Sequence, residues 1–98
     1  MVTVLKTDYF SKWLDKLQDL HARAKVLARI ERFASGNAGD VKALGGALSE
    51  MRISYGPGYR VYFTENSGKI VILLAGGDKR TQSADIRRAR LIMKNLIL

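Results

Sequence analysis

The sequence predicts an α+β fold in which a helical hairpin covers one face of an antiparallel sheet. Apolar residues recur at helical spacing through the first third of the chain, and the pattern changes to alternation from residue 48 onward. Gly-Pro-Gly at residues 56–58 separates two alternating runs, as a turn between neighbouring strands does. A chain of 98 residues buries enough surface for one core, so we expect a single domain over residues 1–98.

The first elements are a strand and two helices. The segment 2–5 is short and has a β-branched composition, which predicts a strand. Thr7 or Asp8 is suited to capping the helix that follows. The apolar stripe of that helix consists of Phe10, Trp13, Leu14, Leu17 and Leu20. A second helix is predicted from about residue 21 to residue 35, where Gly36 is a natural terminator. The two stripes predict a helical hairpin packed on a flat surface.

The remaining elements form a sheet and a last helix. The Gly-rich segment 35–46 is predicted to be a loop. Strands are then predicted at residues 48–55, 59–64 and 69–75. The last of these is apolar on both faces, which is typical of a central strand. We therefore expect a three-stranded meander with the hairpin on one face, followed by a helix from Thr81 or Ser83 to about Leu96.

Charge and composition narrow the function. The chain has 17 Lys and Arg against 9 Asp and Glu, a net charge of +8, which favours a polyanionic partner. Nucleic acid comes first and an acidic protein second, while a merely soluble basic surface is the simplest alternative. With no Cys and one His, a disulfide scaffold and a thiol nucleophile are excluded, and we expect neither a metal nor a cofactor.

Localisation follows from what the sequence lacks. The longest apolar run, residues 70–75, is far too short to span a bilayer. Residues 1–6 do not have the layout of a signal peptide. We therefore expect a cytoplasmic protein that makes no contact with membranes.

Cationic residues converge on one predicted face of the sheet. Arg52 and Arg60 lie on neighbouring strands, and alternation places both on the face that the hairpin leaves open, together with Tyr62. Lys79 and Arg80 directly precede a helix N-terminus, where exposed amides favour an anion. These residues predict a phosphate site with an aromatic platform for a base. The alternative is that the arginines pair across the sheet with Glu50 or Glu65.

Catalysis at such a site would depend on cations. Asp78 and Asp85 are the acids near the cationic loop, and both have ordinary capping roles, while His21 is remote from it and is expected to be structural or exposed. RNA cleavage through its own 2′-hydroxyl needs orientation, a proton acceptor and positive charge at the developing phosphorane. Tyr62 would serve as that acceptor only with a strongly lowered pKa.

Several motifs carry a family resemblance over roughly residues 10–89. They are Glu50-x-Arg52-Ile53, Gly56-Pro57-Gly58-Tyr59-Arg60-Val61-Tyr62-Phe63, and Leu73-Leu74-x-Gly76-Gly77-Asp78-Lys79-x-Thr81-Gln82 followed by Asp85-Ile86. In these motifs the chain resembles the HigB-like addiction-module killer proteins. These are toxins of type II toxin–antitoxin systems in the RelE/ParE superfamily.

The resemblance implies a RelE-like fold: an N-terminal strand, a helical hairpin, a curved antiparallel sheet and a C-terminal helix. It implies ribosome-dependent cleavage of mRNA by an endoribonuclease whose partners are the ribosome, mRNA and a helix-turn-helix antitoxin. Arg60 matches the family's phosphate-binding arginine, and Arg52 and either Lys79 or Arg80 match its other basic positions.

Further basic and aromatic residues are predicted to bind RNA, and two other functions fit the same fold. We expect Tyr62, Arg87, Arg88 and Lys42 to contact RNA. Because a fold does not fix a function, two alternatives stay open. One is a ParE-like poison of DNA gyrase without nuclease activity, and the other is a non-toxic RNA-binding regulatory domain.

Overall fold

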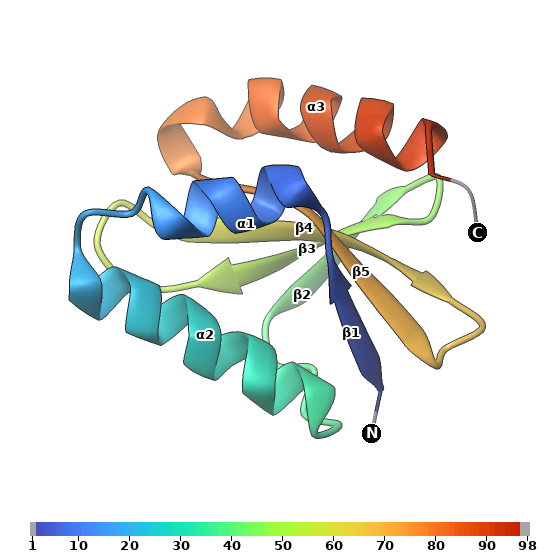
Figure 1. Ribbon diagram of the computed structural model, residues 1–98, viewed down its shortest axis with the longest axis horizontal. Helices are drawn as coiled ribbons and strands as arrows, with labels where there is room; N and C mark the ends of the chain where they lie inside the picture. Colours follow the sequence, from blue (N-terminus) through green and yellow to red (C-terminus); the bar gives the residue numbers. More distant parts are fainter. Residues whose placement is uncertain (1, 97–98) are drawn as a thin grey trace.

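The sheet is mixed and has more strands than the meander predicted. The computed structural model describes residues 2–96, so residues 1, 97 and 98 of the predicted domain lie outside the described residues. Within that range a 5-stranded sheet has the order β1-β5-β4-β3-β2. The strands are β1 (Thr3–Lys6), β2 (Val41–Gly45), β3 (Leu48–Ile53), β4 (Tyr59–Asn66) and β5 (Ile70–Asp78). β1 pairs with β5 in parallel and the other pairs are antiparallel, so the α+β prediction is confirmed (Figure 1).

Side-chain caps define where the helices begin. The helices are α1 (Asp8–Asp15), α2 (Leu20–Ala34) and α3 (Gln82–Lys94), the last preceded by a 3-10 turn over Lys79–Thr81. The Thr7 hydroxyl accepts a 3.1 Å hydrogen bond from the Phe10 amide, which caps α1 as predicted. Asp19 accepts from the amides of His21 and Ala22 and starts α2. Leu20 therefore opens α2 with 69% of its surface exposed, and its predicted place in the stripe of the first helix is wrong.

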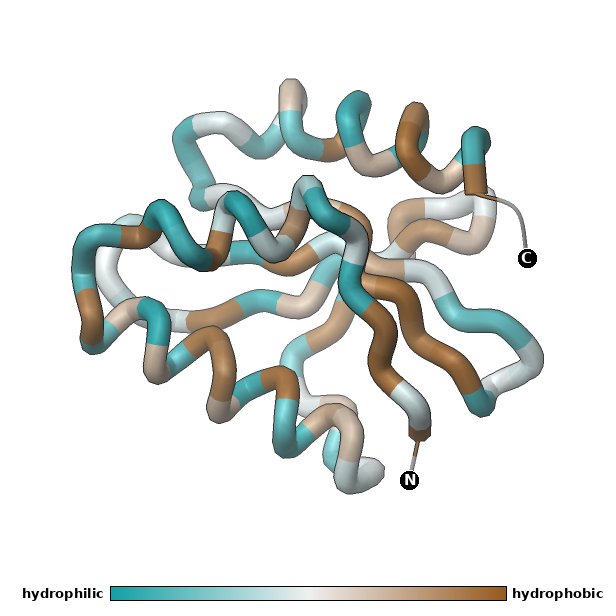
Figure 2. Tube along the Cα trace, in the orientation of Figure 1, coloured by the Kyte–Doolittle hydropathy of each residue, from teal (hydrophilic) through white to brown (hydrophobic). Residues whose placement is uncertain are grey.

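The helices cover both faces of the sheet. Buried residues of α1 and α2 pack with alternate residues of β3, β4 and β5 in one apolar cluster. A smaller cluster on the other face joins Tyr62, Leu74 and Ala75 to Ala89 of α3. Figure 1 shows the sheet between α2 and α3. Figure 2 shows apolar residues along β1 and β5, and of these two strands β5 is the buried one. The face that the hairpin leaves open is thus partly covered by α3.

Two strand pairings were not predicted from the sequence pattern. The predicted loop 35–46 contains β2, which pairs with β3 at the sheet edge through a register shift between Ala43 and Gly45. The strand is short and the irregularity between Ala43 and Gly45 interrupts its alternation, so the prediction of a loop there is wrong. β1 joins the sheet by pairing with β5, at the opposite edge.

The end of β5 needs glycine for close packing. A Cβ at Gly76 would overlap the ring of Trp13 from α1, and a Cβ at Gly77 would overlap the Asp85 carboxylate from α3. Gly76 and Gly77 therefore let two helices approach one strand from different sides. Among residues 2–96, the helices lack the combination of length and apolar character needed to cross a membrane.

Candidate functional site

A hollow at the ends of β3 and β4 collects most of the predicted catalytic cations. We call it the β3–β4 pocket; it has a volume of about 400 Å³. Its lining consists of Asp40, Arg52, Ile53, Ser54, Gly58, Tyr59, Arg60 and Lys79. The structure therefore brings together Arg52, Arg60 and Lys79, and leaves Arg80 outside this lining.

Strand register and a turn position the three cations. Arg52 and Arg60 face each other directly across the antiparallel β3–β4 pair. The Lys79 amide donates a 2.9 Å hydrogen bond to the Gly58 carbonyl, which holds the 3-10 turn beside the β3–β4 turn. Like charges in directly opposite positions repel each other and destabilise the sheet. Each arginine also has a carboxylate partner, which offsets part of that repulsion, and a bound phosphate would offset more of it through charge-assisted hydrogen bonds.

Arg52 is held by a carboxylate that sequence reasoning did not select. Its Nε and Nη2 donate to Oδ1 of Asp40 over 3.1 and 2.9 Å. The Arg52 amide also donates to the Asp40 carbonyl over 3.0 Å. The side-chain hydrogen bonding that Arg52 donates to Asp40 raises the pKa of Arg52 above its ordinary value. Pairing was anticipated, but with Glu50 or Glu65, because the loop that carries Asp40 had no predicted place beside the sheet.

Arg60 makes the cross-strand pair that was the alternative prediction. Its Nε lies 3.3 Å from Oε2 of Glu50, without the alignment of a hydrogen bond. Glu50 is only 1% exposed and also accepts a 3.3 Å hydrogen bond from Nε2 of Gln82, at the start of α3. The Arg60 side chain is 13% exposed, so it joins a buried ion pair to the lining of the pocket.

Tyr62 does not occupy the predicted position. Its side chain is fully buried in the cluster under α3, and its hydroxyl has no hydrogen-bond partner within residues 2–96. Burial, and to a smaller extent the charge of Glu50, raises the pKa of Tyr62 well above its ordinary value. The expectation of an exposed aromatic platform is therefore wrong, and the pKa shift is opposite to the one that a proton acceptor needs.

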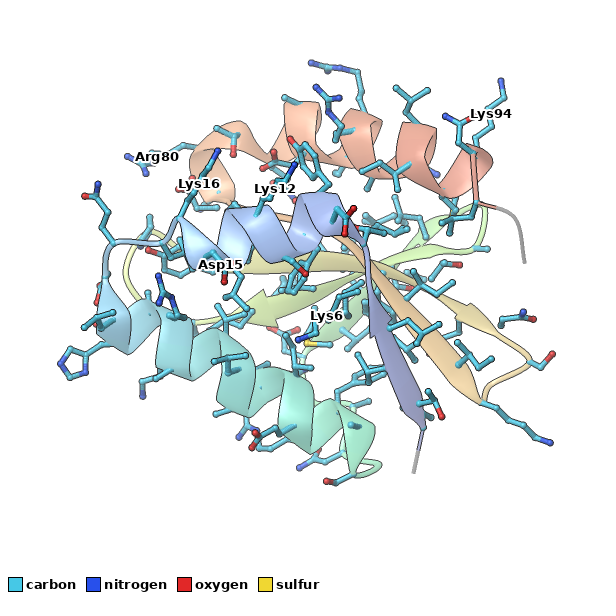
Figure 3. The ribbon with its side chains drawn as sticks, in the orientation of Figure 1. Lys6, Lys12, Asp15, Lys16, Arg80 and Lys94 are labelled. Carbon is cyan, nitrogen blue, oxygen red and sulfur yellow. The ribbon has the colours of Figure 1, made fainter. Side chains whose placement is uncertain are left out.

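The other predicted cations do not line the β3–β4 pocket. Arg80 extends outward from the 3-10 turn, and its Nη2 lies 2.8 Å from Oδ2 of Asp78 (Figure 3). The guanidinium of Arg88 lies 5.2 Å from the ring centroid of Tyr9. Arg87 on α3 and Lys42 on β2 are exposed.

Acidic residues near the cationic turn have structural roles. Asp78 caps the turn by accepting a 2.8 Å bond from the Arg80 amide, and hydrogen bonding by the Arg80 side chain lowers the pKa of Asp78. Asp85 accepts a 2.6 Å bond from the Thr81 hydroxyl, while burial raises the pKa of Asp85. His21 is exposed on α2. Within residues 2–96, the His, Asp and Glu side chains form no group of three suited to holding a metal ion.

A second hollow adjoins the first and was missed. It is lined by Lys25, Arg29 and Arg32 of α2, and it shares Arg52 and Asp40 with the β3–β4 pocket. The three cations are spaced four and three residues apart, which places them on one side of a helix. That spacing could have indicated a cationic side of the helix. It could not indicate that this side of α2 lies against the end of β3.

Comparisons with known proteins identify the family of this chain. Residues 12–96 match the family described as "Phage derived protein Gp49-like (DUF891)". A protein of Haemophilus influenzae, described only as uncharacterized, is 46% identical over 95 residues, which cover 97% of this chain and 96% of the relative. The family match includes Arg52, Arg60 and Lys79. The chain therefore belongs to the Gp49-like phage-derived family, which is a RelE/addiction-module toxin-like family.

Proposed function

We propose that this protein is a HigB-like toxin of a type II toxin–antitoxin module. In this proposal it inhibits translation by ribosome-dependent, metal-independent endonucleolytic cleavage of mRNA in the cytoplasm. The observation that carries the proposal is the convergence of Arg52, Arg60 and Lys79 on one pocket. Membership of a toxin-like family supports it and also supports an antitoxin as partner. We infer that this antitoxin is a helix-turn-helix protein.

The chemistry assigned to the pocket is transesterification within the RNA. The 2′-oxygen bonds to the adjacent phosphorus and gives its proton to water. The bond from phosphorus to the 5′-oxygen breaks to leave a 2′,3′-cyclic phosphate, and that 5′-oxygen takes a proton from water. Negative charge builds up on the non-bridging oxygens during the step. Guanidinium and ammonium groups fixed beforehand around the phosphate stabilise that charge without reorganising. We assign this role to Arg52, Arg60 and Lys79, and assign orientation of the RNA to the ribosome.

The remaining cations have positions suited to docking. Arg80 is exposed beside the pocket, so we assign it attraction of the RNA backbone, outside the contacts to the reacting phosphate. Lys42, Arg87 and Arg88 lie on exposed surfaces and are assigned contacts to ribosomal RNA phosphates. Tyr62 is left out of the site because its ring is buried.

The test is to induce the protein without an antitoxin and map the 5′ ends of cellular mRNA. We expect new ends within translated regions for the wild type, and their loss for Arg52→Ala. Lys94→Ala is the matched control, because Lys94 is exposed near the end of α3 and does not line the pocket (Figure 3). Growth arrest with intact mRNA would overturn the proposal. Inhibited supercoiling in that case would identify a gyrase poison, whereas harmless expression would favour a non-toxic RNA-binding domain.

A further inference from the structure

The hollow beside α2, which we call the α2 pocket, adjoins the β3–β4 pocket. It has a volume of about 480 Å³, and the two share Asp40, Arg52, Ile53 and Ser54. Arg52 therefore stands on the boundary and lines both hollows. A ligand extended along this surface would pass from one hollow to the other beside a single arginine.

The combined groove is strongly cationic. Lys25, Arg29 and Arg32 line the α2 pocket, while Arg60 and Lys79 line the β3–β4 pocket. Among the residues that line either hollow, Asp40 is the one carboxylate, and it is already bonded to the shared Arg52. Cations concentrated in a groove focus the positive potential and attract an extended polyanion.

Arg29 is a buried and fixed part of the wall of the α2 pocket. It is only 4% exposed and donates a hydrogen bond to the Ala38 carbonyl, while its guanidinium packs against the backbone of Gly39. Its Nη1 is buried and has no hydrogen-bond partner within residues 2–96. Burial, and next the charge of Arg32, lowers the pKa of Arg29. The pocket thus holds a desolvated cation with a spare donor, beside a second cation that repels it.

We propose that the α2 pocket binds a second phosphate of the single RNA strand whose scissile phosphate lies in the β3–β4 pocket. The inference rests on the proposed function, since that function places the strand in the neighbouring hollow. Two adjoining hollows with a shared arginine suit a ligand that repeats its charge along a chain. A phosphate in the α2 pocket reduces the repulsion between Arg29 and Arg32 and fixes the register of the strand.

The test measures binding of 2′-O-methyl RNA, which lacks the attacking hydroxyl. A dinucleotide has one phosphate, and a tetranucleotide with three can reach both hollows. The variant is Lys25→Ala with Arg32→Ala, because both side chains are exposed and leave Arg29 in place. The matched control is Lys6→Ala with Lys69→Ala, which removes the same charge from exposed positions outside both hollows.

We expect the wild type to bind the tetranucleotide more tightly than the dinucleotide. The α2 variant should lose about ten-fold in affinity for the tetranucleotide, with a shallower salt dependence, and less than about two-fold for the dinucleotide. The control should change either affinity by less than about two-fold. Thermal melts of both variants verify folding before the binding constants are compared.

Three results would contradict the proposal that the α2 pocket binds a second phosphate. They are equal affinities for the dinucleotide and the tetranucleotide, equal losses of affinity in variant and control, or equally tight binding of a glutamate peptide of matched charge. The last would identify an acidic protein as the ligand. Intact cellular mRNA together with length-dependent binding would instead defeat the proposed cleavage while supporting the groove. Cleaved mRNA without length-dependent binding would contradict the second phosphate site and leave the proposed cleavage standing.

Discussion

The two faces of the sheet differ in how completely helices cover them. The face under α1 and α2 is apolar, and its core includes Phe10, Val26, Val61 and Phe63. The face under α3 has a smaller apolar cluster, beyond which lie buried Glu50 and the partly buried Arg60. Gln82 opens α3 and contacts Glu50, so the charged part of this face begins where the covering helix begins.

This difference explains where the candidate site lies. A helix that covered the whole of the second face would require apolar residues at the positions of Arg52 and Arg60. Because α3 starts at Gln82, those positions stay accessible at the sheet end, and the 3-10 turn brings Lys79 to them. One face thus supplies the larger apolar core, and the other combines a smaller core with a cationic pocket.

The largest effect is expected from breaking the buried pair on the α3 face. Arg60→Ala leaves the nearly inaccessible Glu50 without its cation, which should cost about 3 kcal/mol of unfolding free energy. Adding Glu50→Gln removes the uncompensated charge and should restore most of that stability without restoring mRNA cleavage. Urea unfolding and 5′-end mapping measure the two quantities. A double variant that cleaves like the wild type would remove Arg60 from the site.

The next effect probes packing on the α1 side of β5. Gly76→Ala places a methyl group against the Trp13 ring and should cost about 2 kcal/mol through overpacking. The combination with Trp13→Ala makes room for that methyl group, so the two losses should be less than additive. Thermal and urea unfolding of the single and double variants test this. Strict additivity would mean that the contact is not the cause.

A smaller effect of opposite sign is expected at Tyr62. Tyr62→Phe removes a buried hydroxyl that has no partner within the described residues, so it should stabilise the fold by about 1 kcal/mol. Cleavage and growth arrest should be unchanged, because the ring lies under α3. Loss of activity in a stable Tyr62→Phe protein would restore the tyrosine to the site that the sequence predicted.

The smallest effect is a pH dependence at the start of α3. Burial raises the pKa of Asp85 above 3.8, so the native state binds its proton more tightly than the unfolded chain does. Stability from this group is therefore present below pH 3.8 and is lost as the pH rises through the raised native pKa. Asp85→Asn should flatten that part of the stability curve and keep an acceptor for the Thr81 hydroxyl. An unchanged pH profile in urea unfolding would contradict the assignment.

Alternation was enough to predict the central fold and part of the site. It placed Arg52 and Arg60 on one face of neighbouring strands, and their register makes them directly opposite. It could not show that α3 packs on that face, because the partner of a helix stripe is set by tertiary packing. Tyr62 was misplaced for this reason: the same alternation that exposes one position at the sheet end buries another beneath a helix.

Contacts between residues far apart in the sequence were also not predicted. Asp40 lies twelve residues from Arg52 in a segment predicted to be a loop, and the short β2 that follows brings it alongside. Lys25 and Arg32 had a readable helical spacing, yet nothing local linked α2 to the end of β3. Residues within one strand or turn were therefore predictable, whereas residues joined by sheet order or layer packing were not.

The central claim is that one phosphate contacts Arg52, Arg60 and Lys79 together. Its most direct test is an NMR titration of the isotope-labelled protein with the 2′-O-methyl dinucleotide, following arginine Nε–H and lysine ammonium signals. We expect the signals of these three residues to shift along one saturation curve, with Arg87 and Arg88 unaffected. Shifts confined to Arg87, Arg88 and Lys42, with Arg52 and Arg60 unchanged, would contradict the account.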